Sequence, residues 1–239
     1  YYTMIAVFSL FLRANFGLSA GTAGLIYSVF MGAVYFFPFL GGMVADKYGY
    51  GKMVTLGIFI MFIGYLLLAI PLGGDTFALI FMCGALLCVS IGTGLFKGNL
   101  QVLTGNLYDS PQYAARRDAG FSLFYVFINI GGLVAPFVAP LLRSWWLKVN
   151  GFIYNSQLPR LCHEFISNGT TSQNFMDEAV KAGADPAMLA QGGEAVGTFC
   201  TNYLDVFNAG IHYSFIASVV AMMISLVIFL ANKKKFPTP

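Results

Sequence analysis

The chain has 239 residues, of which 58% are hydrophobic and only 10% are charged, and its formal net charge is +3. Its mean hydropathy is +0.74. A soluble domain carries about 25% charged residues, so this chain has too few polar groups to cover a water-soluble fold. The composition therefore excludes an ordinary soluble protein and predicts a chain embedded in a membrane.

Apolar segments separated by short polar connections make up most of the chain. The first of them, 1–13, would cover only about 18 Å as a helix, and we expect it to be a helix that has lost its cytoplasmic start. Five later segments have the length of about 17–25 residues that a spanning helix needs. These are 21–44, 53–70, 76–107, 119–142 and 211–231. The predicted fold class is an all-α membrane protein with six transmembrane helices.

Lysine and arginine residues are distributed unequally between alternate connections, and this predicts the orientation. One set of connections carries Lys47, Lys52, Arg116, Arg117, Lys233, Lys234 and Lys235. The opposite set carries Arg13 and a long polar loop, and long loops weigh little in the positive-inside rule. We expect the first set and the N-terminal side to be cytoplasmic, in a multi-pass protein of the cytoplasmic (inner) membrane. The long loop would be periplasmic or extracellular.

The stretch 143–208 is polar and holds most of the acidic residues. Its segments DEAVKAG and ADPAMLAQ have the composition of short helices, and Asp185 followed by Pro186 is typical of a cap and first turn. We interpret the stretch as a polar external insertion between helices five and six. The expected division is 1–142 for helices one to five, 143–208 for the insertion, and 209–239 for helix six and its basic end.

Two of the four cysteines, Cys162 and Cys200, fall in this predicted insertion. A cysteine pair outside the cytoplasm is free to oxidise, so a disulfide is one interpretation and two separate thiols are the other. A disulfide closing this long loop would stabilise the fold by about 3–4 kcal/mol. Cys83 and Cys88 lie in an apolar segment and are expected to pack as small hydrophobic residues. No spacing typical of a metal site is present, and no cofactor is expected.

A single charged side chain, Lys97, interrupts the long fourth apolar segment. It would lie about 17 Å from the end of that helix, near the middle of the bilayer. A lysine there costs about 2.5–3.5 kcal/mol, and such residues usually face a bundle interior or a water-filled cavity. The alternative is that the side chain extends to the cytoplasmic edge. Gly92, Gly94 and Gly98 would let a neighbouring helix or a ligand approach closely.

The connection GGMVADKYGYGK, residues 41–52, resembles the loop motif of the major facilitator superfamily. In that motif a glycine, an aspartate and basic residues follow at fixed spacing, and the residues that fit are Gly42, Asp46, Lys47, Gly49 and Lys52. Gly42 is expected to permit a tight helix contact, and Asp46 to meet a helix N-terminus or a basic partner. An ordinary cytoplasmic turn with anchoring lysines is the alternative interpretation.

Two further stretches, GTGLFKGN and FYVFINIG, lie on successive apolar segments. The first presents Gly92, Gly94, Lys97 and Asn99, and the second presents Phe124, Tyr125, Ile128, Asn129 and Gly131. Together they resemble the fourth- and fifth-helix motifs of the proton-dependent oligopeptide transporter (POT/PTR) family. The opening YYTM, with Tyr1, Tyr2 and Met4, resembles the end of that family's first-helix signature, E-x-x-E-R-F-x-Y-Y-x-M. Ile5 stands where the family usually has an arginine.

The resemblance implies a transporter in which two six-helix bundles rock about a central site. The chain would be the N-terminal half, one major-facilitator-type bundle, and would take part in proton-coupled symport of di- and tripeptides. The implied partners are protons, peptides, the lipid bilayer and the C-terminal six-helix half, with no nucleic acid. Lys97 would bind the peptide carboxylate or exchange with a carboxylic acid during proton movement, and Asn129 would hydrogen-bond the peptide. The other residues expected at the site are Tyr1, Tyr2, Tyr35 and Asn99.

Two other functional classes remain open at this point. A major facilitator transporter for a drug or a small organic anion would share the loop motif, and competition of uptake by di- and tripeptides would distinguish it. A non-transporting membrane protein, such as a sensor, is the third class, and a transport assay under a pH gradient would distinguish that. An enzyme is not expected, because no span carries a nucleophile and base or a set of metal ligands.

Overall fold

The computed structural model describes residues 2–72 and 76–236, and every regular element within them is helical. Five of the described helices are long and apolar enough to cross a membrane. They are α2 (Ala20–Tyr48), α3 (Tyr50–Ala69), α4 (Thr76–Asn106), α5 (Arg117–Val149) and α9 (Gly193–Asn232). The predicted all-α membrane fold is confirmed at this level. The sixth span stays a prediction, because α1 (Tyr2–Phe16) has only 15 residues.

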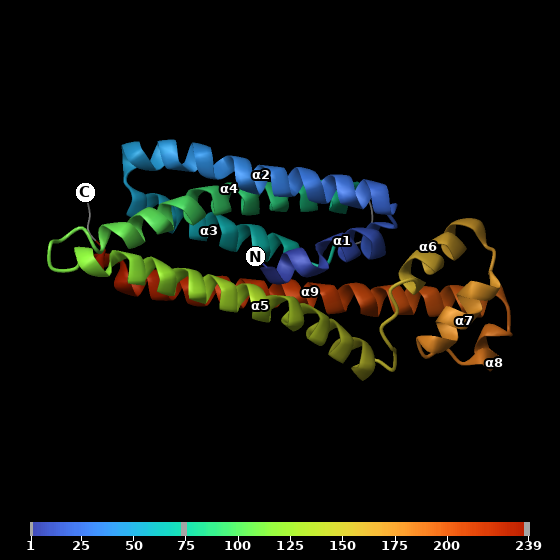
Figure 1. The fold of residues 1–239 in the computed structure, drawn as a ribbon. Helices are drawn as coiled ribbons and strands as arrows, with labels where there is room; N and C mark the ends of the chain where they lie inside the picture. Colours follow the sequence, from blue (N-terminus) through green and yellow to red (C-terminus); the bar gives the residue numbers. More distant parts are fainter. Residues whose placement is uncertain (1, 73–75, 237–239) are drawn as a thin grey trace.

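The long helices run side by side in an elongated bundle (Figure 1). α4 packs against both α2 and α3, α3 also contacts α9, and α9 contacts α5, while α1 contacts α2, α5 and α9. Three short helices gather at one end of the bundle, around the start of α9 (Figure 1): α6 (Leu158–Asn168), α7 (Gln173–Lys181) and α8 (Pro186–Leu189). We call residues 150–192, which hold these three helices, the cap.

The turn from α2 to α3 lies at the opposite end of the bundle and is made by a single residue. Gly49 follows the last residue of α2 and precedes the first residue of α3, with a φ of 94°. This left-handed region is costly for residues with a side chain, so a glycine is required for so abrupt a reversal. The start of α5 and the end of α9 lie at the same end (Figure 1). We call it the basic end, because the helix termini there carry the lysines at 47, 52 and 233–235 and the arginines at 116 and 117.

Backbone contacts between glycines hold α2 and α3 against α4. A methyl group at Gly41 would lie 2.4 Å from the carbonyl oxygen of Gly94, and one at Gly57 would lie 2.8 Å from that of Gly92. Small residues of this kind let membrane helices pack closely, so the close approach expected at Gly92 and Gly94 is confirmed. It is not found at Gly98, where a methyl group would meet no described atom within 4 Å. The expectation for Gly42 is wrong, because a methyl group there would meet nothing within 4 Å. One residue earlier, Gly41 is the position that faces α4.

The predicted boundaries of the polar insertion differ from the helix ends. α5 continues to Val149, beyond the expected end at residue 142, and α9 begins at Gly193, well before the expected start at residue 211. Both extensions are polar enough to lower the local hydropathy, yet they continue helices that already exist, and propagation is much easier than nucleation. Both predicted short helices are present: α7 contains most of DEAVKAG and ends at Lys181, and α8 lies within ADPAMLAQ. Asp185 caps α8 by accepting a hydrogen bond from the Ala187 N–H at 2.9 Å.

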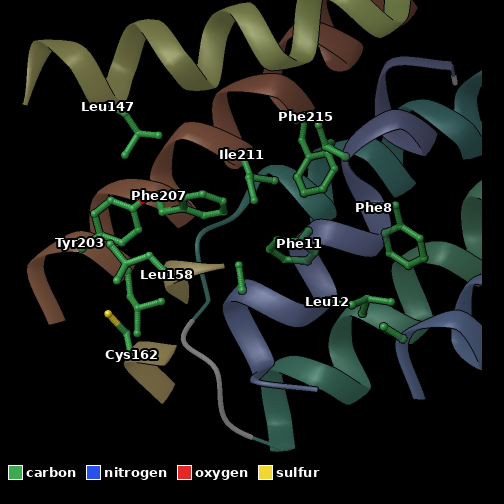
Figure 2. Packing of buried hydrophobic residues seen from close by; sticks show 14 of the residues in the cluster. Phe8, Phe11, Leu12, Leu147, Leu158, Cys162, Tyr203, Phe207, Ile211 and Phe215 are labelled. Atoms are coloured by element: carbon green, nitrogen blue, oxygen red, sulfur yellow. The ribbon is translucent and has the colours of Figure 1, made fainter. Parts of the chain in front are cut away.

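The hydrophobic core does not stop at the start of the cap. One cluster of buried side chains extends from α1 along α9 and into α6 and α7. Figure 2 shows its centre, where Phe11 of α1 lies near Ile211 and Phe215 of α9, and Leu158 and Cys162 of α6 lie near Tyr203 and Phe207. The cap therefore shares its core with the bundle and is fixed to it by apolar packing.

Polar contacts also fix the cap to α1, α5 and α9. His163 of α6 donates a hydrogen bond from Nε2 to the carbonyl oxygen of Ala14, 2.6 Å away, near the end of α1. The Arg143 guanidinium of α5 lies over the ring of Tyr154, 3.9 Å from its centroid. The hydroxyl of Tyr203 on α9 accepts a hydrogen bond from the Asn155 N–H at 3.0 Å. Movement of the cap relative to the bundle would break all three contacts.

Cys162 and Cys200 are both fully buried in this shared core, and both are free thiols in the structure. They are close neighbours, since a hydrogen bond between the two thiols, together with burial, raises the pKa of Cys162. The alternative of two thiols too far apart to interact is therefore wrong. Whether the pair oxidises stays a prediction.

Candidate functional site

Exposed polar and aromatic side chains gather on one face formed by α1, α2, α4 and α5. Most of the expected binding residues that lie in the described part of the chain are here. We call this surface the polar face and define it by six residues: Tyr2, Tyr35, Lys97, Gln101, Tyr125 and Asn129.

Lys97 and Tyr35 form the contact between α4 and α2 on this face. The Lys97 ammonium lies 5.2 Å from the centroid of the Tyr35 ring, and the tyrosine is 67% exposed. A cation over an aromatic face at this distance gains about 0.5–1 kcal/mol at an exposed site. No described carboxylate forms an ion pair with Lys97. Its positive charge is therefore held by an aromatic ring and is available to an anion.

Gln101 and Tyr125 connect α4 to α5. The Gln101 side-chain amide donates a hydrogen bond to the Tyr125 hydroxyl, at 3.3 Å. Because Gln101 follows Lys97 by four residues, the two side chains share one side of α4. This contact brings the positive group of α4 and the exposed side of α5 to the same surface.

Asn129 lies on the same side of α5, between two residues whose contacts are known. It is exposed and follows Tyr125 by four residues, which places both on one helix face. Gly132, three residues further, faces α1, because a methyl group there would lie 3.7 Å from the Tyr2 ring. The helical repeat therefore puts Asn129 between the Gln101 contact and the Tyr2 contact.

The other two expected binding residues differ from this group. Tyr1 lies outside the described residues. Asn99 is 2% exposed and lies between helices, where its amide donates hydrogen bonds to the carbonyl oxygens of Gly41 (3.2 Å) and Leu95 (2.8 Å). These contacts give Asn99 a packing position at the α2–α4 contact, away from the polar face.

The loop motif at the basic end has its own local structure. Asp46 accepts a hydrogen bond from the hydroxyl of Tyr50, which follows it by four residues across the Gly49 turn. The Lys47 ammonium lies 5.6 Å from the centroid of the Tyr48 ring. Lys52 is exposed in the first turn of α3. The carboxylate of Asp46 thus lies next to the first residue of α3, while the assignment of the loop motif stays a prediction.

Gln101 and Tyr125 were not among the predicted site residues, although each stands four residues from one that was. That spacing is the signal that could have identified them, because i and i+4 side chains lie on one helix face. The described residues hold no group of three or more side chains suited to a metal ion. The side chains of the polar face can form hydrogen bonds and pair with a charge.

A family model described as the POT family matches residues 51–239, which is more than half of the chain. The chain belongs to the POT family. The matched range includes Lys97, Gln101, Tyr125 and Asn129, so two of the four helices that form the polar face lie within it.

Several curated transporters are similar to this chain in sequence. The chain is 37% identical over 139 residues to the peptide transporter YePEPT of Yersinia enterocolitica, in an alignment covering 57% of this chain and 25% of that protein. It is 38% identical over 159 residues to the uncharacterized transporter YclF of Bacillus subtilis, in an alignment covering 64% of this chain and 31% of that protein. It is 33% identical over 148 residues to a di-/tripeptide transporter of Lactobacillus helveticus, in an alignment covering 61% of this chain and 28% of that protein.

Solved structures of the family share the fold. A mutant of peptide transporter POT in complex with alafosfalin aligns with 99% of this chain and 36% of its own, at a TM-score of 0.64 and 25% identity. The structure of peptide transporter POT in complex with sulfate aligns with 99% of this chain and 35% of its own, at a TM-score of 0.63 and 25% identity. The chain thus spans about a quarter to a third of the length of the curated relatives above and of these structures.

Proposed function

We propose that the full-length protein containing this chain is a proton-coupled symporter of di- and tripeptides that works by alternating access. The chain supplies the N-terminal six-helix bundle, with α1 as part of the first span. Membership of the POT family supports the proposal, as do relatives named as peptide and di-/tripeptide transporters. A C-terminal bundle completes the central site opposite the polar face.

The observation that carries the proposal is the position of the Lys97 ammonium. It is exposed on the polar face, lies over the Tyr35 ring and has no described carboxylate partner. A charged residue within a spanning helix is expensive unless it serves a pathway or a ligand. The C-terminal carboxylate of a peptide is a suitable ligand, because charge-assisted hydrogen bonds to an ammonium are strong.

The neighbouring side chains provide the rest of the recognition. Asn129 can both donate and accept hydrogen bonds, which suits the peptide amide group. Tyr2, Tyr35 and Tyr125 present hydroxyls and aromatic faces that tolerate many peptide side chains. Proton coupling is assigned to Lys97 together with a carboxylic acid elsewhere in the full-length protein.

The proposal also includes a location in the membrane. The basic end lies on the cytoplasmic side of the inner membrane, because Lys and Arg of short connections favour that side. The cap then lies on the periplasmic or extracellular side. Cysteine substitution with a membrane-impermeant thiol reagent tests this, since a cysteine at exposed Glu194 would react in intact cells and one at exposed Lys52 would not.

Uptake into proteoliposomes tests the function. A labelled dipeptide should accumulate when a pH gradient, acidic outside, is imposed, and unlabelled di- and tripeptides should compete. Accumulation that is unaffected by peptides but is blocked by an organic anion or a drug would favour another major facilitator transporter. No uptake of any of these by correctly folded protein would favour a non-transporting membrane protein.

A further inference from the structure

A groove lies between α3 and α9 near the basic end, away from the polar face. Its volume is about 450 Å³. Four residues of α3 and three from the end of α9 and the turn that follows it line the groove: Lys52, Thr55, Leu56, Phe59, Leu226, Leu230 and Lys233.

The walls of the groove are apolar along most of their length. Leu56, Phe59 and Leu230 are each between 43% and 51% exposed, although α3 and α9 pack against one another beneath them. In a membrane-spanning bundle, exposed side chains of this kind face the hydrocarbon. From Lys52 to Phe59 the wall extends about 10 Å along α3, at 1.5 Å per residue. An acyl chain can lie in a groove of this length and chemistry.

The mouth of the groove is positively charged. Lys52 lies in the first turn of α3 and Lys233 directly follows the last residue of α9, so the two ammonium groups flank the same opening. No described carboxylate forms an ion pair with either lysine. Asp46, an acidic residue of the adjoining turn, is hydrogen-bonded to Tyr50. The N-terminus of α3 adds a further partial positive charge.

We propose that this groove binds one anionic phospholipid, with its phosphate between Lys52 and Lys233 and an acyl chain along Leu56, Phe59 and Leu230. The anionic headgroup matches the positively charged mouth of the groove, and the acyl chain matches its apolar wall. A free phosphate would leave the apolar wall unused, and a zwitterionic phospholipid would not complement two lysines. Basic pockets between helices on the cytoplasmic side are suited to lipid headgroups of this kind.

The proposal requires that α3 and α9 cross the membrane, and it is independent of peptide transport. A failure to transport peptides would leave it intact, and loss of lipid binding would leave the peptide site intact. Its experiment must therefore measure the lipid directly.

Native mass spectrometry of the full-length protein in detergent measures lipid retention. Phosphatidylglycerol, phosphatidylcholine and inorganic phosphate are each titrated against the wild type and the Lys52→Gln/Lys233→Gln variant. Lys148→Gln is the matched control, because Lys148 is exposed at the last turn of α5, near the cap. Neither groove lysine is buried beneath other side chains, so the double variant should fold.

The expected result is saturable binding of phosphatidylglycerol that exceeds binding of phosphatidylcholine. Each lysine near an anionic headgroup contributes roughly fivefold, so the double variant should bind phosphatidylglycerol about 25-fold more weakly. The Lys148→Gln variant should bind it like the wild type. Equal binding of the two lipids, or unchanged binding by the double variant, would overturn the proposal. Displacement of the lipid by inorganic phosphate at matched concentration would also overturn it and indicate a free-anion site.

Discussion

The side-chain amide of Asn99 donates a hydrogen bond to the carbonyl oxygen of Gly41, 3.2 Å away, across the contact of α4 with α2. The same amide also donates to the Leu95 carbonyl oxygen within its own helix, and its residue is almost completely buried. This motif residue therefore stabilises the helix contact on which the neighbouring Lys97 is presented.

Replacement of Asn99 by alanine should lower stability more than it lowers peptide affinity. The substitution removes a buried hydrogen bond between helices, which is worth about 1 kcal/mol, and leaves a small cavity. The thermal midpoint of the purified full-length protein should fall, whereas the affinity of its folded fraction for a dipeptide should stay within about twofold.

Asn129→Ala is the matched comparison, because Asn129 is exposed on the polar face. Its thermal midpoint should be unchanged, and its dipeptide affinity should fall about fivefold to tenfold, as expected for loss of one hydrogen bond to a ligand. The assignment of these two asparagines is wrong if Asn99→Ala alone reduces affinity, or if Asn129→Ala changes neither quantity.

The glycine contact between α2 and α4 gives a second prediction. Gly41→Ala should destabilise the protein by about 2 kcal/mol or more, because its methyl group would lie 2.4 Å from the Gly94 carbonyl oxygen and the helices would have to separate. Gly42→Ala, with open space around the new methyl group, should be neutral or slightly stabilising, since alanine favours helix. Thermal denaturation of the two variants measures the difference. Equal midpoints would show that the helices do not approach as described.

Tyr35 provides a test of the ring beneath Lys97. Tyr35→Phe keeps the aromatic face and should retain peptide uptake near the wild-type level. Tyr35→Ala removes the face and should weaken dipeptide affinity about threefold to fivefold, the amount that an exposed cation–π contact supports. Equilibrium binding of a labelled dipeptide to both variants makes the measurement. A loss in Tyr35→Phe as large as that in Tyr35→Ala would instead assign the role to the hydroxyl.

The cysteine pair gives a fourth prediction. We expect protein isolated without reductant to contain a Cys162–Cys200 disulfide, because the thiols meet in one core on the side expected to be oxidising. Two protons and two electrons leave the thiols, and the disulfide of a thiol oxidoreductase accepts them. Since both cysteines are fully buried after folding and out of reach of an oxidoreductase, the bond should form while the cap is still folding.

Alkylation of denatured protein before and after reduction measures this bond. In the wild type, reduction should raise the number of alkylated thiols by two. In the Cys162→Ser/Cys200→Ser variant, reduction should leave that number unchanged. An equal number of alkylated thiols in the wild type before and after reduction would refute the disulfide.

Hydropathy predicted the long helices well because each is a continuous apolar run, which needs no information from other parts of the chain. It could not predict that α9 begins at Gly193, because the first turns of α9 are polar and are held in a helix by contact with α6. Hydropathy also failed to predict α6, because α6 is not a continuous apolar run. It is short, and its buried residues, such as Leu161 and Phe165, alternate with charged ones such as Arg160 and Glu164.

The candidate site was predictable in part. The motifs identified Lys97 and Asn129 because a charge or amide in an apolar span is conspicuous in a single sequence. The pairing of Lys97 with Tyr35 depends on the distance between two helices, which no local pattern contains. The sequence pointed to Gly42 as the residue at the helix contact, whereas the structure has Gly41 there. The motif does not settle which of two adjacent glycines faces α4, and one residue rotates the position by about 100° around a helix.

The most direct test of the account is proton-driven uptake by the Lys97→Ala variant of the full-length protein in proteoliposomes. With a pH gradient that is acidic outside, the wild type should accumulate a labelled dipeptide, and the variant should lose this accumulation while retaining a normal thermal midpoint. Lys148→Ala, which changes a lysine near the cap, should behave like the wild type. Uptake by Lys97→Ala that equals the wild type in both rate and dependence on the gradient would contradict the central role of Lys97.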